Sequence, residues 1–199
     1  MTTGRVVGYF ERQAAGYHGR QASGVWSWLR QREEAVVARL LGRIDGLRVL
    51  DLACGSGYYS RVVTAGGGRS VALDLSPGML ARAREHAGNR CVRADLAALP
   101  FQRAFDRVVL AGGLEFVDDP RAVLRQIEEC LADGGEAVVL FPPPTLAGRL
   151  YRFYHRAHGL AIRLFAVHEL EALAHDAGLL MVEPARAHSY AVVARLRRA

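Results

Sequence analysis

The stretch Val49-Leu50-Asp51-Leu52-Ala53-Cys54-Gly55-Ser56-Gly57-Tyr58 decides the fold of this chain. Its apolar first half is typical of a buried strand, and the two glycines indicate a tight turn. Apolar residues then resume at helical spacing. A strand, a turn and a helix start form the local geometry that nucleotide cofactors use, and the acid at the end of the strand decides which nucleotide fits.

Strands and helices alternate from residue 47 onward, which predicts an α/β fold around a parallel sheet. The expected strands are 47–52, 70–74, 90–94, 105–110, 136–141, 179–184 and 190–196. The expected helices between them are 58–65, 77–86, 120–132 and 167–177. Ser76 and Asp119 precede prolines and are expected to cap two of these helices. Asp133-Gly134-Gly135 is expected to end the helix at 120–132.

Two further segments stand outside this alternation. Residues 1–45 predict one or two helices before the sheet, of which 23–42 has the clearer apolar face. Three prolines at 142–144 introduce residues 145–165, which are rich in Leu, Tyr, Arg and His. We expect a small helical cap there, over the carboxyl edge of the sheet, within a single domain spanning 1–199.

The amino-acid composition limits which classes of protein the chain can belong to. Hydrophobic residues make up 51% and charged residues 23% of 199 residues, which indicates a globular chain. The apolar runs fall short of the roughly 20 residues of a membrane span, and the N-terminus lacks signal-peptide character, so a cytoplasmic protein is expected. Three scattered cysteines make no disulfide or zinc pattern, and no metal site is expected.

The net charge of +6 comes almost entirely from arginine. It is compatible with a nucleic acid, a membrane surface or an anionic substrate. A GC-rich genome, which would also explain the many alanines, accounts for it equally well.

Acids stand at the ends of three of the first four expected strands. Ligands bind open parallel sheets outside these carboxyl ends. Asp51 ends the first strand, Asp74 the second, and Asp95 follows the third. A carboxylate after the second strand suits a ribose, and one after the third suits the amino group of adenine, with Leu75 and Leu96 packing the base.

A dinucleotide site is disfavoured. The fingerprint G-x-G-x-x-G lacks its third glycine here, because Ser60 stands there. Asp51 would repel a diphosphate and attract a cationic ligand. A nicotinamide-dependent dehydrogenase is therefore the weaker alternative.

The chain resembles the class I S-adenosylmethionine-dependent methyltransferases of small-molecule type over most of its length. The resemblance covers the motifs at 49–57, 72–80, 93–101, 105–119 and 131–140, and a lid helix ending at Tyr17-His18. It implies a Rossmann-like, doubly wound sheet of seven strands, mostly parallel with the last antiparallel. It also implies lid helices within residues 1–45 and S-adenosylmethionine as cofactor. The cofactor-binding residues that it implies are Asp51, Ala53, Gly55, Ser56, Gly57, Asp74, Leu75, Met79, Asp95, Leu96, Ala111 and Gly112.

The substrate side departs from the family pattern. Position 18 is His where relatives commonly have Asp, and the usual histidine after the fourth strand is replaced within Gly113-Leu114-Glu115-Phe116. The candidate catalytic groups are Tyr17, His18 and Glu115, although a solvated or structural role is the plainer interpretation of Glu115. The substrate-side candidates are Tyr17, Leu114, Tyr151, Tyr154 and His155. His155 and His158 also fit the surface of a basic helix.

The leading hypothesis is an enzyme that transfers a methyl group to O, N or C of a small, hydrophobic or aromatic molecule by in-line displacement. A catalytically inactive partner or sensor that binds the same cofactor is the alternative. A nucleic-acid methyltransferase is less favoured, because Ala111-Gly112-Gly113-Leu114 replaces the [DNS]-P-P-[YFW] motif of such enzymes. The basic, aromatic segment 145–165 also predicts peripheral membrane contact.

Overall fold

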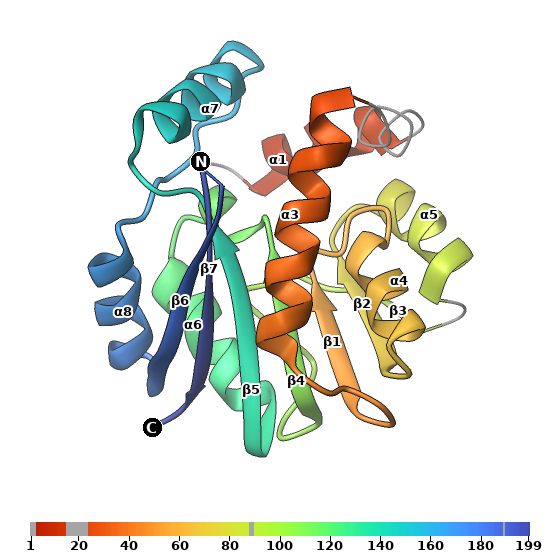
Figure 1. Ribbon diagram of the computed structural model, residues 1–199. Coiled ribbons are helices and arrows are strands. Elements are labelled where there is room, and N and C mark those ends of the chain that lie inside the picture. The colour runs from red at the N-terminus through yellow and green to blue at the C-terminus, as the bar shows by residue number, and fades with distance from the viewer. Residues whose placement is uncertain (1–2, 15–23, 88–89, 189) are drawn as a thin grey trace.

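The computed structural model describes residues 3–14, 24–87, 90–188 and 190–199. They build a seven-stranded sheet in the order β3-β2-β1-β4-β5-β7-β6 (Figure 1). The strands are β1 Arg48–Leu52, β2 Arg69–Asp74, β3 Cys91–Arg93, β4 Phe105–Ala111, β5 Leu131–Phe141, β6 Leu179–His188 and β7 Ala191–Arg198. The helices are α1 Thr3–Gln13, α3 Gly24–Leu41, α4 Tyr58–Ala65, α5 Pro77–Ala87, the short 3-10 helix η2 Leu114–Phe116, α6 Pro120–Cys130, α7 Leu146–Ala157 and α8 Val167–Asp176.

The strand directions confirm the expected Rossmann-like sheet. β7 pairs antiparallel with both β5 and β6, and every other pairing is parallel. The order reverses between β1 and β4, and this switch point is where doubly wound sheets bind ligands.

Both faces of the sheet are buried. Leu50 and Leu52 of β1 point into the cluster that packs against α6 and α8, whereas Val49 joins the cluster beneath α3 and α4. The side-chain period of two in a strand separates these neighbours onto opposite faces. The apolar run of β1 is thus explained by burial on both sides, as in other parallel sheets.

Helix α6 ends earlier than predicted. It stops at Cys130, because Leu131 adopts an extended conformation and pairs with Phe105 of β4. Asp133-Gly134-Gly135 therefore lies inside β5, where a shift of register follows, and does not end the helix. The expectation that it would was wrong.

The last two strands run further than predicted. β6 continues past Pro184 to His188 and β7 runs to Arg198. Proline is tolerated here because β6 is an edge strand of the sheet, paired with β7 on one side only.

The two N-terminal helices have different places. α3 lies across β5, β6 and β7 and buries Val37, Leu40 and Leu41, so it is a covering helix of the sheet. α1 instead contacts α5 at the carboxyl end of the strands. α7 stands at the same end, beyond β5, as Figure 1 shows.

Candidate functional site

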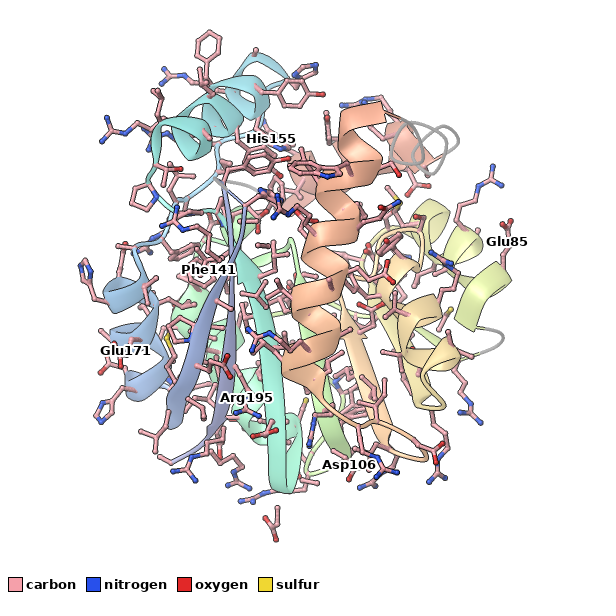
Figure 2. All side chains as sticks on the ribbon, viewed as in Figure 1. Glu85, Asp106, Phe141, His155, Glu171 and Arg195 are labelled. Atoms are coloured by element: carbon pink, nitrogen blue, oxygen red, sulfur yellow. The ribbon has the colours of Figure 1, made fainter. Side chains whose placement is uncertain are left out.

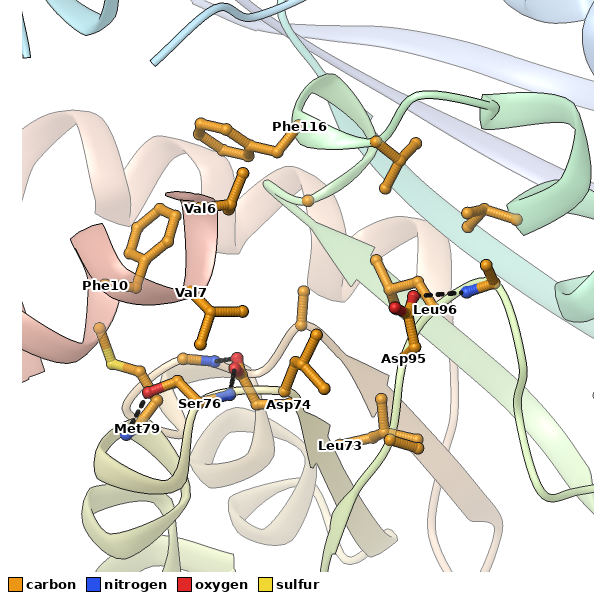
Figure 3. A pocket seen from close by; sticks show the side chains of 18 of the residues that line it. Val6, Val7, Phe10, Leu73, Asp74, Ser76, Met79, Asp95, Leu96 and Phe116 are labelled. Atoms are coloured by element: carbon orange, nitrogen blue, oxygen red, sulfur yellow. Dashed lines mark hydrogen bonds between the residues drawn. The ribbon is translucent and has the colours of Figure 1, made fainter. Parts of the chain in front are cut away.

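A cavity of about 310 Å³ opens at the carboxyl ends of β1, β2 and β4. Figure 3 shows its side chains, which come from α1, the loop after β2, the loop after β3 and the segment after β4. Eight of the residues expected to bind a cofactor line it, namely Ala53, Gly55, Asp74, Leu75, Met79, Asp95, Leu96 and Gly112.

Asp74 ends β2 and organises the two loops beside it. Its Oδ2 accepts a hydrogen bond from the backbone nitrogen of Gly55 at 2.9 Å, and its Oδ1 accepts one from the nitrogen of Ser76 at 2.8 Å. Burial raises the pKa of Asp74, and these N–H groups offset part of that rise. A carboxylate offers about four lone-pair sites, so Asp74 keeps acceptor capacity for a ligand beside these backbone donors.

Ser76 ties α1 to the cavity. Its Oγ accepts from the backbone nitrogen of Met79 at 3.1 Å, which confirms the expected N-cap of α5. The same hydroxyl donates to the carboxylate of Glu11 in α1, which also accepts from the nitrogen of Gly78. These hydrogen bonds lower the pKa of Glu11.

Helix α1 supplies three apolar residues of the cavity wall, Val6, Val7 and Phe10. Sequence reasoning missed them, and it missed Glu11. The only local signal was the amphipathic spacing of residues 6, 7 and 10.

Asp95 stands across the cavity from Asp74 in Figure 3. Its Oδ1 accepts from the backbone nitrogen of Ala97 at 3.0 Å. Leu75 and Leu96 both line the cavity, in line with their expected places beside a planar base.

Four of the expected cofactor residues do not line the cavity. Ser56 and Ala111 are two of them. Asp51 is 1% exposed, and its Oδ2 accepts from the hydroxyl of Ser60 at 2.5 Å. Burial raises the pKa of Asp51 to about 7, with the nearby Asp74 adding to the rise.

Gly57, the fourth, packs against a helix. It has a φ of 83°, and a Cβ there would lie 2.9 Å from the Cα of Ala83 in α5. The glycine therefore permits close packing of α4 on α5 as well as the left-handed turn.

Glu115 and His155 are buried, at 3% and 6% exposure. Of the two roles expected for Glu115, solvated or structural, its burial contradicts the solvated one. The expected surface position of His155 was wrong, because its ring lies against Phe116 of η2. Burial raises the pKa of Glu115 to about 7 and lowers that of His155 to about 4. Oε2 of Glu115 and Nδ1 of His155 have no hydrogen-bond partner among the described residues.

The remaining substrate-side candidates are dispersed. Leu114 lies in the core with no exposure, and Tyr154 is 48% exposed. The ring of Tyr151 stacks on Tyr190 with centroids 5.3 Å apart. None of these side chains lines the cavity. Tyr17 and His18 lie outside the described residues.

Within the described ranges no group of His, Cys, Asp or Glu is arranged to hold a metal ion. Cys54 and Cys130 are buried as expected, whereas Cys91 is partly exposed. Among the same residues, no helix combines the length and apolarity that crossing a bilayer demands.

The chain is similar to known methyltransferases in both sequence and fold. Residues 50–139 match the family model described as "Methyltransferase domain". A demethylmenaquinone methyltransferase of Clavibacter sepedonicus is 38% identical over 127 residues, which are 60% of this chain and 52% of that protein. A malonyl-[acyl-carrier protein] O-methyltransferase of Erwinia pyrifoliae is 39% identical over 103 residues, 51% of this chain and 38% of that protein. The chain spans about half the length, or less, of these curated relatives.

A solved structure extends the likeness to the whole chain. Magnesium protoporphyrin IX methyltransferase of Synechocystis PCC 6803, with bound SAH, superposes with a TM-score of 0.79 at 19% identity, covering 100% of both chains. At 19% identity the match shows a similarity of fold alone. The chain therefore has the fold of this solved methyltransferase, and its residues 50–139 match the methyltransferase family model.

Proposed function

We propose that this chain binds S-adenosylmethionine in the 310 Å³ cavity and transfers its methyl group to a small, apolar or aromatic acceptor. One observation carries the proposal: Asp74 and Asp95 line a cavity whose other walls are largely apolar. Two carboxylates accept hydrogen bonds and repel phosphates, so they suit a cationic nucleoside with free hydroxyls and an amino group.

In this proposal, different residues of the chain bind different parts of the cofactor. Asp74 holds the ribose hydroxyls with the acceptor capacity that its backbone donors leave. Asp95 accepts from the adenine amino group, while Leu75 and Leu96 contact the base. Gly55 lies against the methionine portion of the cofactor. Asp51, buried behind the cavity wall, attracts the cationic cofactor through its charge.

The cofactor supplies a methyl group on a sulfonium, whose leaving group is already activated. The protein then has to align the acceptor and exclude water, which is an effect of positioning. Val6, Val7, Phe10 and Phe116 are among the apolar residues of the wall and favour an apolar acceptor. We regard α1 as the lid of a single domain, 1–199, with residues 145–165 as its cap.

Glu115 does not line the cavity but lies just behind its wall, and we propose it as the group that takes a proton from the acceptor. Its Oε1 lies 3.9 Å from where a Cβ of Gly112 would stand, and Gly112 lines the cavity. A carboxyl with a pKa near 7 is suited to exchange protons at neutral pH. Tyr17 and His18 stay predictions.

Titration calorimetry with S-adenosylmethionine and S-adenosylhomocysteine tests the cofactor. Absence of heat at high micromolar ligand would end the proposal. Transfer is then tested with labelled cofactor on quinols, phenols, acyl thioesters and RNA. Binding without transfer to any of them would favour the inactive partner or sensor, and transfer to RNA alone would favour the nucleic-acid alternative.

A further inference from the structure

Helix α7 presents a large apolar face to solvent. Leu146, Leu150, Phe153 and Tyr154 are 77%, 63%, 71% and 48% exposed. Leu146, Leu150 and Phe153 are spaced four and then three residues apart, so they form one stripe along the helix. Tyr154 lies beside this stripe. We call these four side chains the α7 face. They make up most of the large hydrophobic side chains found exposed among the described residues.

The opposite side of α7 is fixed to the protein, so the exposure of the α7 face is built into the fold. Tyr151 stacks on Tyr190, and His155 is buried, pointing toward the rest of the molecule in Figure 2. Gly148 packs so closely against Pro143 that a Cβ at position 148 would lie 2.0 Å from the carbonyl oxygen of Pro143. Thr145 caps the helix by accepting from the nitrogen of Gly148 at 3.1 Å.

The α7 helix is also strongly basic. It contains Arg149, Arg152 and Arg156, all exposed, and no acidic residue between 146 and 157. None of the three forms an ion pair within the described part of the chain, whereas Arg163 just beyond the helix pairs with Glu169 at 2.5 Å. The positive charge beside the α7 face is therefore uncompensated.

We propose that the α7 face docks on the surface of an anionic phospholipid bilayer. The apolar side chains would enter the boundary between headgroups and acyl chains, and the three arginines would meet lipid phosphates. A second copy of the chain is the poorer occupant, because a twofold contact through α7 would bring arginines against arginines with no acid to offset them.

Helix α7 lies next to the rim of the cavity through its buried side, opposite the α7 face. Phe116, which lines the cavity, has its ring centroid 5.4 Å from that of His155 in α7. Tyr9 of α1 lies 6.3 Å from His158 by the same measure. A bilayer under the α7 face would thus be separated by helix α7 from the apolar wall that includes Val6, Phe10 and Phe116. Delivery of a lipophilic acceptor from the bilayer is the one part that rests on the proposed function.

Co-sedimentation of the full chain with vesicles tests the docking. We expect binding to phosphatidylcholine vesicles that contain about 30% phosphatidylglycerol, weak binding to phosphatidylcholine alone, and release by salt. Leu150→Gln with Phe153→Gln, and separately Arg149→Gln with Arg152→Gln and Arg156→Gln, should each weaken the partition about tenfold or more.

Two matched controls separate this face from general charge and exposure. Arg84→Gln with Arg90→Gln and Arg125→Gln removes the same charge from exposed sites elsewhere, and Val182→Gln changes an apolar side chain that is 43% exposed on β6. Both should bind vesicles as the parent does. Thermal melts check that every variant is folded.

Three outcomes would overturn the proposal. The first is no binding to anionic vesicles, and the second is equal loss in the control triple variant. The third is a dimer that Leu150→Gln with Phe153→Gln dissociates, without vesicle binding by the parent. Calorimetry with S-adenosylhomocysteine on the same samples reports separately on the proposed function, because docking on vesicles does not require a working cofactor site.

Discussion

The carboxylate of Glu11 lies 3.1 Å from the backbone nitrogen of Gly78, so a side chain of α1 closes the first turn of α5. A Cβ at position 78 would stand 2.7 Å from Oε1 of Glu11, so a side chain there would displace the carboxylate from its present position. The contact joins the wall supplied by Val6, Val7 and Phe10 to the loop that Asp74 organises.

Replacing Glu11 by Ala should loosen α1. Because the folded-state pKa of Glu11 is lowered, its contribution is present above the ordinary glutamate pKa and is lost as the pH falls through the folded value. We expect faster amide exchange over Thr3–Gln13 and weaker cofactor binding at pH 7. Glu85→Ala, in an exposed ion pair on α5, is the control. Unchanged exchange in the Glu11 variant would contradict the link.

Asp74→Asn and Asp95→Ala test the two acidic contacts. Loss of a hydrogen bond to a charged group costs about 1.5–3 kcal/mol, which corresponds to about ten- to hundredfold weaker cofactor binding. Titration calorimetry measures it. Asp106→Asn, which breaks an ion pair with Arg48 on the protein surface, should leave the affinity unchanged. Parent-like affinity in both cavity variants would remove the basis of the proposed function.

Cofactor affinity should rise with pH through Asp51. Its pKa of about 7 means that the carboxyl is mostly neutral at pH 5.5. A bound cation favours the carboxylate, so binding releases a proton, and affinity should increase about tenfold between pH 5.5 and 7. Calorimetry in buffers of different ionisation enthalpy counts that proton. Asp51→Asn should flatten the rise; if the variant keeps the full slope, another group is responsible.

Glu115→Gln separates catalysis from structure. If Glu115 accepts the acceptor's proton, kcat should fall about hundredfold or more and lose its rise near pH 7, while the KM for the cofactor stays constant. A purely structural Glu115 predicts an unchanged pH profile of kcat.

The same substitution has an expected effect on stability. The pKa of Glu115 is raised from 4.5 to about 7 by folding, so the folded chain holds the proton more tightly than the unfolded one. The parent should therefore lose about 3 kcal/mol of unfolding free energy relative to Glu115→Gln as the pH rises from 4.5 to above 7. Denaturant melts at pH 5 and pH 8 measure the difference.

Gly57→Ala should destabilise the protein by about 3 kcal/mol, because strain at positive φ adds to overpacking against Ala83. Gly42→Ala is a matched control, since Gly42 has a φ of 66° and no atom lies within 4 Å of the place that its Cβ would take. It should cost only about 1 kcal/mol. Equal losses in denaturant melts would show that packing on α5 contributes nothing.

Much of the fold could be predicted from the sequence, because its signals are local. Helix α4 begins and ends where the glycine turn and the following apolar spacing placed it, at Tyr58 and Ala65. Asp74 and Asp95, two of the three acids at the strand ends, line the cavity where neighbouring tips in a parallel sheet must meet, whereas Asp51 is buried behind its wall. The end of α6 was missed because pairing of Leu131 with Phe105 is a contact between distant segments.

Parts of the site that depend on contacts between segments distant in the sequence were harder to predict. Glu11 gives no sign in the sequence that it will meet Gly78, and His155 gives none that α7 will bury it against Phe116. The glycine pattern indicates a ligand contact at Gly57, although its neighbour in space is Ala83. In each case the decisive partner lies dozens of residues away along the chain.

Pro184 has a consequence for how molecules meet one another. It occupies the outermost strand, β6, where unpaired N–H and C=O groups would otherwise offer a template to a neighbour's strand. Because Pro184 has no N–H, the row of backbone groups that could pair with another strand is interrupted at this residue. At Pro184 a second molecule's strand therefore has no N–H to pair with, which disfavours edge-to-edge association along β6.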